Sequence, residues 1–334
     1  MKSEALTIPE PVALEHPMPQ VSVSTVRYLK NSRSKATRAG YRRDWLRFER
    51  WCQERGLSAL PATPATIANF ASYRADEGRK LNTIRREIAA IARYHRLHPE
   101  RDDKGRPLPP PAQAEGVKET LSGIARKVGS MVDKAPPIMR DDLRVMAATF
   151  DGDSLRGVRD QAVLLSGWLT VCRRSEIIAL NVEDFKVTAD GAEVLIRRSK
   201  NDQEGKGLTK ICYYAKREPE LCAVIAVQRW LRLSGFKSGR LFPTIRNNGK
   251  VGEGRMDGEA VARIVQRAAV RAGIEDRAFT AHSLRAGGIS QMAADGVPLD
   301  AIKAHSGHKS VAVLLGYIRR AQAWDGKGAT AGLL

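Results

Sequence analysis

Apolar residues recur at helical spacing through the first 130 residues of the chain. Tyr41, Trp45, Phe48 and Cys52 follow one another at intervals of four, three and four residues, which places them on one face of an α-helix. The other faces of this helix carry several arginines. The segment is therefore expected to be an amphipathic helix with one buried face.

Three more helices are expected in this part of the chain. One begins where Thr63 precedes Pro64, because threonine is a favourable N-cap and proline a favourable first helical residue. The next two helices have inward stripes of their own. Those stripes are Leu81, Ile84, Ile88 and Ile91 in the first, and Val117, Leu121, Ile124 and Val128 in the second. The pattern predicts a small all-helical domain.

The second half of the chain mixes helices with short strands. A pair of helices is expected around 140–180, followed by strands near 184–188, 192–198 and 209–214 that are separated by turn signals. Helical patterns then resume and continue to the end. This half is typical of an α+β fold, mainly α with a small antiparallel sheet.

Glycine, serine and proline interrupt the helical pattern between the two halves. We expect a flexible tail at 1–22, where proline and glutamate are frequent, a helical domain at 23–132, and a second domain at 138–334.

Charge narrows the choice of partner. The chain has 56 Lys and Arg against 37 Asp and Glu, a net charge of +19, which favours a polyanionic partner such as nucleic acid. A ribosomal-type binder and a membrane-surface protein are the alternatives. No apolar run is long enough to span a bilayer, and the N-terminus does not resemble a signal peptide. We expect a cytoplasmic protein associated with the nucleoid.

Cysteine and histidine spacing argues against a metal centre. Cys52, Cys172, Cys212 and Cys222 are scattered without a CxxC pair, and the six histidines are dispersed. Neither a zinc site nor a disulfide framework is expected. The cysteines are interpreted as small buried residues in a reducing compartment.

A tyrosine stands nine residues after a Gly-His pair near the C-terminus. If Val311, Leu314, Leu315 and Ile318 form the inward stripe of a last helix, then Tyr317 lies roughly 110° from the centre of that stripe. A half-buried packing tyrosine explains this placement. A reactive tyrosine also explains it, provided that His308 lies in the turn before the helix, where Gly307 allows the chain to bend.

Three cationic motifs precede this tyrosine. His282 and Arg285 are three residues apart and share a helix face if Thr280 is the N-cap. Arg173 is likewise three residues before Glu176, and Lys200 lies at the start of a predicted hairpin turn. Each motif alone is also compatible with an ordinary solvated surface.

Together these residues suit attack on a phosphodiester. A tyrosine hydroxyl, with a pKa of about 10, is a poor nucleophile unless a base takes its proton. Arginines and a histidine can hold the negative charge that develops on the phosphate oxygens, and a lysine can protonate the departing alkoxide. This scheme requires no metal ion.

The ordered set Arg173-x-Ser175-Glu176, Lys200, His282-x-x-Arg285, Gly307-His308 and Tyr317 resembles the tyrosine recombinase (phage integrase) family. The resemblance covers the whole second half, and the basic helical first half is similar to the core-binding domain of the Cre-like branch. It implies a core-binding domain followed by a catalytic domain, which together clamp duplex DNA.

The resemblance also implies roles at the scissile phosphate. Tyr317 would be the nucleophile, forming a 3′-phosphotyrosyl link and freeing a 5′-hydroxyl. Arg173 and Arg285 would clamp the phosphate, and His308 would donate a further hydrogen bond to it. Tryptophan replaces this histidine in Cre itself.

Further roles concern proton transfer and support. Lys200 would be the general acid, with Lys206 as the alternative hairpin lysine, and His282 would assist proton transfer. Glu176 would support Arg173, which we prefer over the adjacent Arg174 because of its spacing to the acid. No cofactor is implied.

The sequence departs from the family pattern just before Arg173, where Val171-Cys172 replaces the usual Gly-Leu. The resemblance further implies a free monomer that forms a tetramer on two inverted-repeat DNA sites. In the family the tail after the tyrosine docks on a neighbouring subunit. The tail of this chain either does the same or remains frayed.

Two other classes of function remain open at this point. A type IB topoisomerase or telomere-resolving enzyme shares the chemistry, and a basic DNA-binding regulator shares the charge but cuts nothing. A metal-dependent transposase would need converging carboxylates, and no such set stands out. The residues considered for DNA contact, with an ordinary solvated basic face as the alternative, are Arg42, Arg43, Arg47, Lys80, Arg85 and Arg86.

Overall fold

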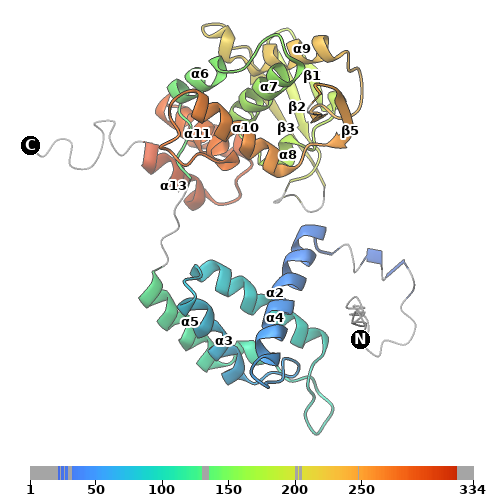
Figure 1. Ribbon diagram of the computed structural model, residues 1–334, viewed down its shortest axis with the longest axis vertical. Coiled ribbons are helices and arrows are strands. Elements are labelled where there is room, and N and C mark those ends of the chain that lie inside the picture. Colours follow the sequence, from blue (N-terminus) through green and yellow to red (C-terminus); the bar gives the residue numbers. More distant parts are fainter. Residues whose placement is uncertain are drawn as a thin grey trace, which may run out of the picture. The chain divides into compact units, whose positions relative to one another are not determined.

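The computed structural model describes residues 22, 24, 25, 27, 28, 32–129, 135–199, 202, 205–246 and 248–321, without the side chains of Glu253 and residues 318–321. The predicted tail at 1–22 lies almost entirely outside these residues, and so does Lys200. The chain divides into two compact units, residues 1–132 and 133–334, and each is described by itself (Figure 1).

Unit 1 is all helical over its described residues. The predicted inward residues Trp45, Phe48 and Cys52 are buried, and Thr63 accepts a hydrogen bond from the backbone of Thr66 as the predicted N-cap. Val128, which was expected to face inward, is 45% exposed, because it ends the last turn of its helix. The elements are α2 (Lys35–Gln53), α3 (Pro64–Asp76), α4 (Leu81–Leu97), the 3₁₀ turn η1 (Pro111–Gln113) and α5 (Glu115–Val128).

Buried carboxylates fasten α4 to α2 and α3. Glu87 of α4 is fully buried and accepts two hydrogen bonds from the guanidinium of Arg74, at 2.9 Å each, and one from Arg47 at 2.7 Å. Asp44 of α2, also fully buried, accepts two hydrogen bonds from Arg86. Because a buried carboxylate is stable only with such partners, these arginines support the helix bundle.

Unit 2 surrounds one central helix. Helix α7 contacts α6, α8, α9, α10 and α11 (Figure 1), and its buried residues lie in the main core of the unit. The helices are α6 (Arg140–Ala148), α7 (Leu155–Leu169), α8 (Arg174–Ile177), α9 (Ala223–Ser234), α10 (Gly258–Arg271), α11 (Ala281–Ala294), α12 (Leu299–Ser306) and α13 (Val311–Ala321), with 3₁₀ turns η2 (Val182–Asp184) and η3 (Pro219–Leu221).

Two small antiparallel sheets complete unit 2. Strands β1 (Phe185–Val187), β2 (Gly191–Ile196) and β3 (Leu208–Tyr213) form a meander in which Val194 of β2 lies opposite Lys210 of β3. These are the three predicted strands. A second pair, β4 (Pro243–Ile245) and β5 (Val251–Arg255), was not predicted. The mainly α fold with a small antiparallel sheet is confirmed.

The ion pairs of unit 1 generate a stability prediction. Replacing Glu87 by alanine removes the buried partner of Arg74, whose side chain is 5% exposed, so we expect the free energy of unfolding to fall by about 3 kcal/mol. The control is Glu115→Ala, which breaks a pair with Lys118 whose side chains are 72% and 60% exposed and should cost less than about 1 kcal/mol. Urea unfolding of the full chain measures both. Equal losses in the two variants would contradict this interpretation.

Candidate active site

Arg173 is held by the helix that it precedes. It is the N-cap of α8, and its backbone N–H donates to Oε2 of Glu176 while its guanidinium donates to Oε1, each at 2.8 Å. Glu176 is buried, whereas the Arg173 side chain is 23% exposed. The acid therefore orients the guanidinium and leaves part of it accessible, as the spacing predicted.

Arg285 is buried on α11. Thr280 caps this helix as expected, accepting from the backbone N–H of His282. Gly287 and Gly288 let α11 lie close to its neighbours, because a Cβ on Gly288 would stand 2.3 Å from the carbonyl oxygen of Trp168. At this depth the guanidinium of Arg285 donates to the carbonyl of Val171 and, at 2.8 Å, to that of Ser306.

His308 occupies the turn between α12 and α13, as predicted. Gly307 ends α12 with φ 66°, the left-handed conformation that favours glycine. The His308 ring lies against Arg285, with Nε2 at 3.2 Å from a guanidinium nitrogen and Nδ1 at 2.8 Å from the Ser306 hydroxyl. Burial, followed by the charges of Arg285 and Arg173, lowers the pKa of His308 to about 4.

Tyr317 of α13 meets His282 of α11. The Tyr317 hydroxyl lies 2.8 Å from Nε2 of the exposed His282 ring. Burial raises the pKa of Tyr317, while the charges of Arg285 and Arg173 oppose that rise. The hydroxyl is therefore protonated at neutral pH, with a base beside it.

The inward face of α13 differs from the expectation. Leu314 is fully buried, but Val311 is 38% exposed. Tyr317 instead packs against the apolar cluster that contains Val171, Ile289 and Leu314. The helix thus turns Leu314 and Tyr317 inward, one turn apart, and Tyr317 combines packing with a polar contact at its tip.

Positive charge dominates the resulting site. Burial lowers the pKa of Arg285, and the positive charge of the nearby Arg173 lowers it further. The two guanidinium groups therefore lie close enough to interact, with the carboxylate of Glu176 beside them. Such a set is suited to bind an anion such as a phosphate. In the part of the chain that the structure covers, three or more His, Cys, Asp or Glu side chains nowhere gather as metal ligands would.

The hairpin lysines are only partly covered. Lys200 lies outside the described residues. Lys206 is exposed in the same hairpin, where the carboxylate of Asp202 accepts from the backbone N–H groups of Gly205, Lys206 and Gly207. These bonds organise the turn and lower the pKa of Asp202.

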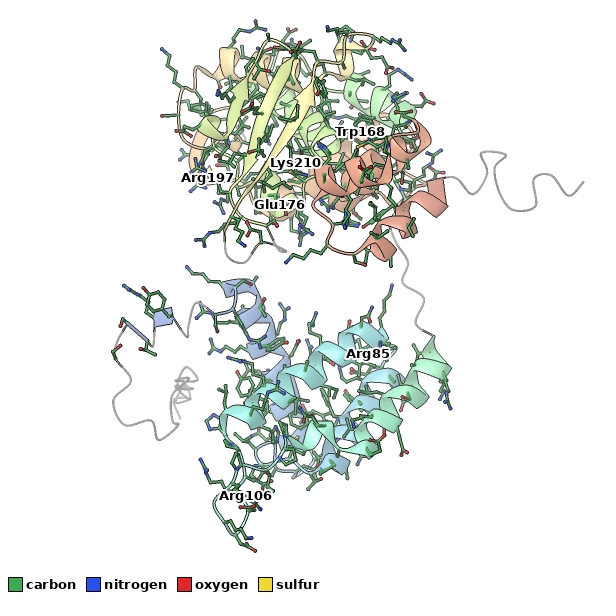
Figure 2. The ribbon with its side chains drawn as sticks, turned by 180° about the vertical axis from the view of Figure 1, so that it is seen from behind. Arg85, Arg106, Trp168, Glu176, Arg197 and Lys210 are labelled. Atoms are coloured by element: carbon green, nitrogen blue, oxygen red, sulfur yellow. The ribbon has the colours of Figure 1, made fainter. Side chains whose placement is uncertain are left out.

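Sequence reasoning missed Lys210 and His305. Lys210 of β3 is 3% exposed, and its ammonium donates to the carbonyls of Thr170 at 2.6 Å and His305 at 2.7 Å (Figure 2). Burial lowers its pKa. The alternation of β3 contained the signal, because Lys210 stands two residues before the buried Cys212. Neither residue belongs to the motifs from which the site was predicted.

Val171 stands where the family pattern has glycine. It is fully buried and has φ 46°, a left-handed conformation that is strained for a β-branched residue. Its carbonyl accepts from Arg285. The position just before Cys172-Arg173 thus demands the backbone conformation that glycine adopts freely.

The residues considered for DNA contact fall into two groups. Arg47 and Arg86 form ion pairs with Glu87 and Asp44 and remain 40% and 46% exposed. The others are exposed: Arg42, Arg43, Lys80 and Arg85 (Figure 2 labels Arg85).

Comparison with known proteins adds sequence and fold relationships. The model of the phage integrase family matches residues 138–323, and that of the phage integrase N-terminal SAM-like domain matches residues 26–99. The chain is 32% identical over 308 residues to an integrase/recombinase XerD homologue of Selenomonas ruminantium, which covers 90% of this chain and 86% of that protein. It is 25% identical to recombinase Cre of Escherichia phage P1 over 80% of this chain and 79% of Cre.

A solved structure shares the fold. It is that of the XerH site-specific recombinase bound to its palindromic difH substrate in a post-cleavage complex, with a TM-score of 0.65 and 15% identity. The match covers 92% of this chain and 83% of XerH. Among the described helices of this chain, none is long and apolar enough to cross a membrane.

The lowered pKa of His308 predicts a dependence of stability on pH. Because the folded-state pKa of about 4 lies below the ordinary value of about 6.5, folding favours the neutral ring. Its contribution is complete above pH ~6.5 and is lost as the pH falls toward 4, by about 2 kcal/mol for a partly exposed ring. Replacing His308 by glutamine should remove this part of the acid-induced loss. Urea unfolding of both proteins between these pH values measures it, and parallel stability curves would refute the prediction.

Proposed function

The chain belongs to the phage integrase family, and from that premise we propose that it is a site-specific tyrosine recombinase that cuts and rejoins DNA. The hydrogen bond between Tyr317 and His282, beside Arg173 and Arg285, carries the proposal. This hydrogen bond places the proposed nucleophile, Tyr317, beside the proposed base, His282, and next to the two arginines that would bind the phosphate. A tyrosine that served packing alone would not require this arrangement.

The first half-reaction is a transesterification. The Tyr317 oxygen attacks the scissile phosphorus while His282 accepts the phenolic proton, so that a Tyr–O–P bond forms and the P–O5′ bond breaks. The departing 5′ oxygen takes a proton from Lys200, the hairpin lysine. Rejoining reverses these steps with the 5′-hydroxyl of another strand, and the phosphodiester energy is kept in the covalent intermediate.

The arginines stabilise the charge that develops on the phosphate. Arg285 is fixed by two backbone carbonyls and Arg173 by Glu176, so little reorganisation is needed when the phosphate oxygens gain charge. These cations supply the electrostatic stabilisation that a metal ion supplies in other phosphoryl-transfer enzymes. No cofactor enters the proposed steps.

His308 would respond to the bound phosphate. In the unbound chain its low pKa keeps the ring neutral beside Arg285. A phosphate anion between these groups favours the protonated ring. The ring can then donate a hydrogen bond to a non-bridging oxygen, which is the role proposed for it.

DNA is the proposed partner, and the net charge of +19 supports this choice. We propose that residues 23–132 form a core-binding domain and residues 138–334 the catalytic domain. The free protein would be a monomer and would assemble as a tetramer on two inverted-repeat sites. It would act at the nucleoid in the cytoplasm, without membrane association. Exposed cations of unit 1 would contact the DNA: Arg42, Arg43, Lys80 and Arg85, with Arg47 and Arg86 held in place by their carboxylates.

A covalent-adduct assay tests the proposed chemistry. A bound sequence is first selected from a randomised duplex library and then synthesised with a nick that traps the cleaved strand. With EDTA present, the wild-type chain should yield a slowly migrating protein–DNA adduct on a denaturing gel, and Tyr317→Phe should yield none. Bound DNA without any adduct would instead support a non-catalytic DNA-binding regulator. Relaxation of a single plasmid without joining of two sites would favour a type IB topoisomerase-like enzyme.

The hairpin lysines can be separated by their chemistry. A sulfur leaving group at the 5′ bridging position needs no proton, so Lys200→Ala should cut an ordinary substrate at least about 100-fold more slowly than wild type and a phosphorothiolate substrate almost normally. The matched control is Lys206→Ala. If only the Lys206 variant shows this selective rescue, the general acid is Lys206 and not Lys200.

A further inference from the structure

The carboxyl ends of α7 and α12 face each other across two cations. Lys210 bridges the carbonyls of Thr170 and His305, and Arg285 bridges those of Val171 and Ser306. The two bridges therefore join consecutive residues, Thr170 and Val171 just after α7 and His305 and Ser306 at the end of α12. Lys210 thus joins one pair of carbonyls, and Arg285, the proposed phosphate-binding arginine, joins the next pair.

A third side chain, that of His305, donates to the same helix end. The His305 ring lies with Nε2 at 2.9 Å from the carbonyl oxygen of Leu169. Three consecutive carbonyls at the end of α7, those of Leu169, Thr170 and Val171, thus accept from His305, Lys210 and Arg285. The last carbonyls of a helix have no partner within the helix and carry its negative dipole end, so basic side chains from elsewhere are suitable partners.

The three partners come from the segments that carry the site. Lys210 belongs to the strand that follows the Lys200 hairpin, Arg285 to the helix of His282, and His305 to the helix that ends at the His308 turn. Arg173 follows Val171 by only two residues in the sequence. The capped end of α7 is consequently the place where these segments meet.

We propose that Lys210 and His305 are positioning residues of the cleavage reaction, which hold the Arg173 loop and the His308 turn against α11 through the C-terminal carbonyls of α7. The inference rests on the proposed function. Neither side chain needs to touch DNA. Both act by fixing the backbone from which the phosphate-binding groups project.

A lysine at the buried position 210 supports the proposed positioning role. The two neighbouring inward positions of β3 hold Leu208, which is partly buried, and Cys212, which is buried, so packing alone would be satisfied by an apolar residue at 210. An ammonium at this position instead donates to the carbonyl of Thr170 through a buried hydrogen bond and to that of His305 through a partly buried one. Lysine has the reach and the three donors that this geometry needs.

The test compares binding with cleavage on the selected nicked duplex. Lys210→Met removes the donors at similar size. We expect its single-turnover cleavage rate at saturating DNA to fall at least about tenfold, with its DNA dissociation constant within about twofold of wild type. The control is Trp230→Phe, which removes another buried hydrogen bond to a backbone carbonyl, that of Leu241 at 2.7 Å, on α9. This control should leave both quantities within about twofold of wild type.

A second pair of variants tests the same idea if Lys210→Met does not fold. His305→Leu removes the donor to Leu169, whereas His305→Gln keeps an N–H at a comparable position. Cleavage should be slow in the first variant and restored in the second, with equal DNA affinity. The proposal is overturned if Lys210→Met cleaves like wild type, if Trp230→Phe is equally slow, or if leucine and glutamine at 305 behave alike.

Failure of the inference differs from failure of the proposed function. A wild-type chain that binds the duplex but forms no adduct refutes the recombinase proposal and this inference with it. A wild-type chain that forms the adduct, together with variants that are unaffected, refutes only the positioning roles of Lys210 and His305.

Discussion

The end of a helix leaves backbone carbonyls without partners, and the fold of unit 2 depends on how one such end is completed. The central helix α7 ends at Leu169, and the carbonyls of Leu169, Thr170 and Val171 accept hydrogen bonds from side chains of other segments. His305, Lys210 and Arg285 supply those donors. Segments far apart in the chain are thereby held at one point, and the groups proposed to act on DNA project from its surroundings.

This arrangement concentrates positive charge where a phosphate is expected. Burial lowers the pKa values of Arg285 and His308, and the positive charges of their neighbours lower them further, so the grouping of these cations is unfavourable without an anion. The carbonyls at the ends of α7 and α12 compensate part of that repulsion, and a DNA phosphate would compensate the rest. The strained backbone of Val171 belongs to the same construction, since its carbonyl faces Arg285.

Local patterns in the sequence predicted much of this. The caps at Thr63 and Thr280, the turn at Gly307 and the pairing of Arg173 with Glu176 depend on neighbours within four residues, so spacing reveals them. The hydrogen bonds that cap α7 join residues that are 40 to 136 positions apart in the sequence. The hydrophobic pattern along the chain does not predict such distant pairs. The prediction that Val311 faces inward was wrong, because the packing of α13 on α11 determines which residues of α13 are buried. Arg47 and Arg86 appeared to be free basic residues because their partners, Glu87 and Asp44, are buried on facing helices.

A site that is assembled before DNA binds should keep its internal contacts when DNA is bound. The most direct test is a crystal structure of the Tyr317→Phe chain bound to its selected duplex with an intact scissile phosphate. In that structure Lys210 should still bridge Thr170 and His305, Arg285 should still donate to Val171 and Ser306, and N–H groups of Arg173 and Arg285 should lie about 3 Å from the non-bridging phosphate oxygens. Movement of Arg285 away from the carbonyls to reach the phosphate, or a phosphate that lies away from residue 317, would show instead that the protein does not hold this site ready for DNA.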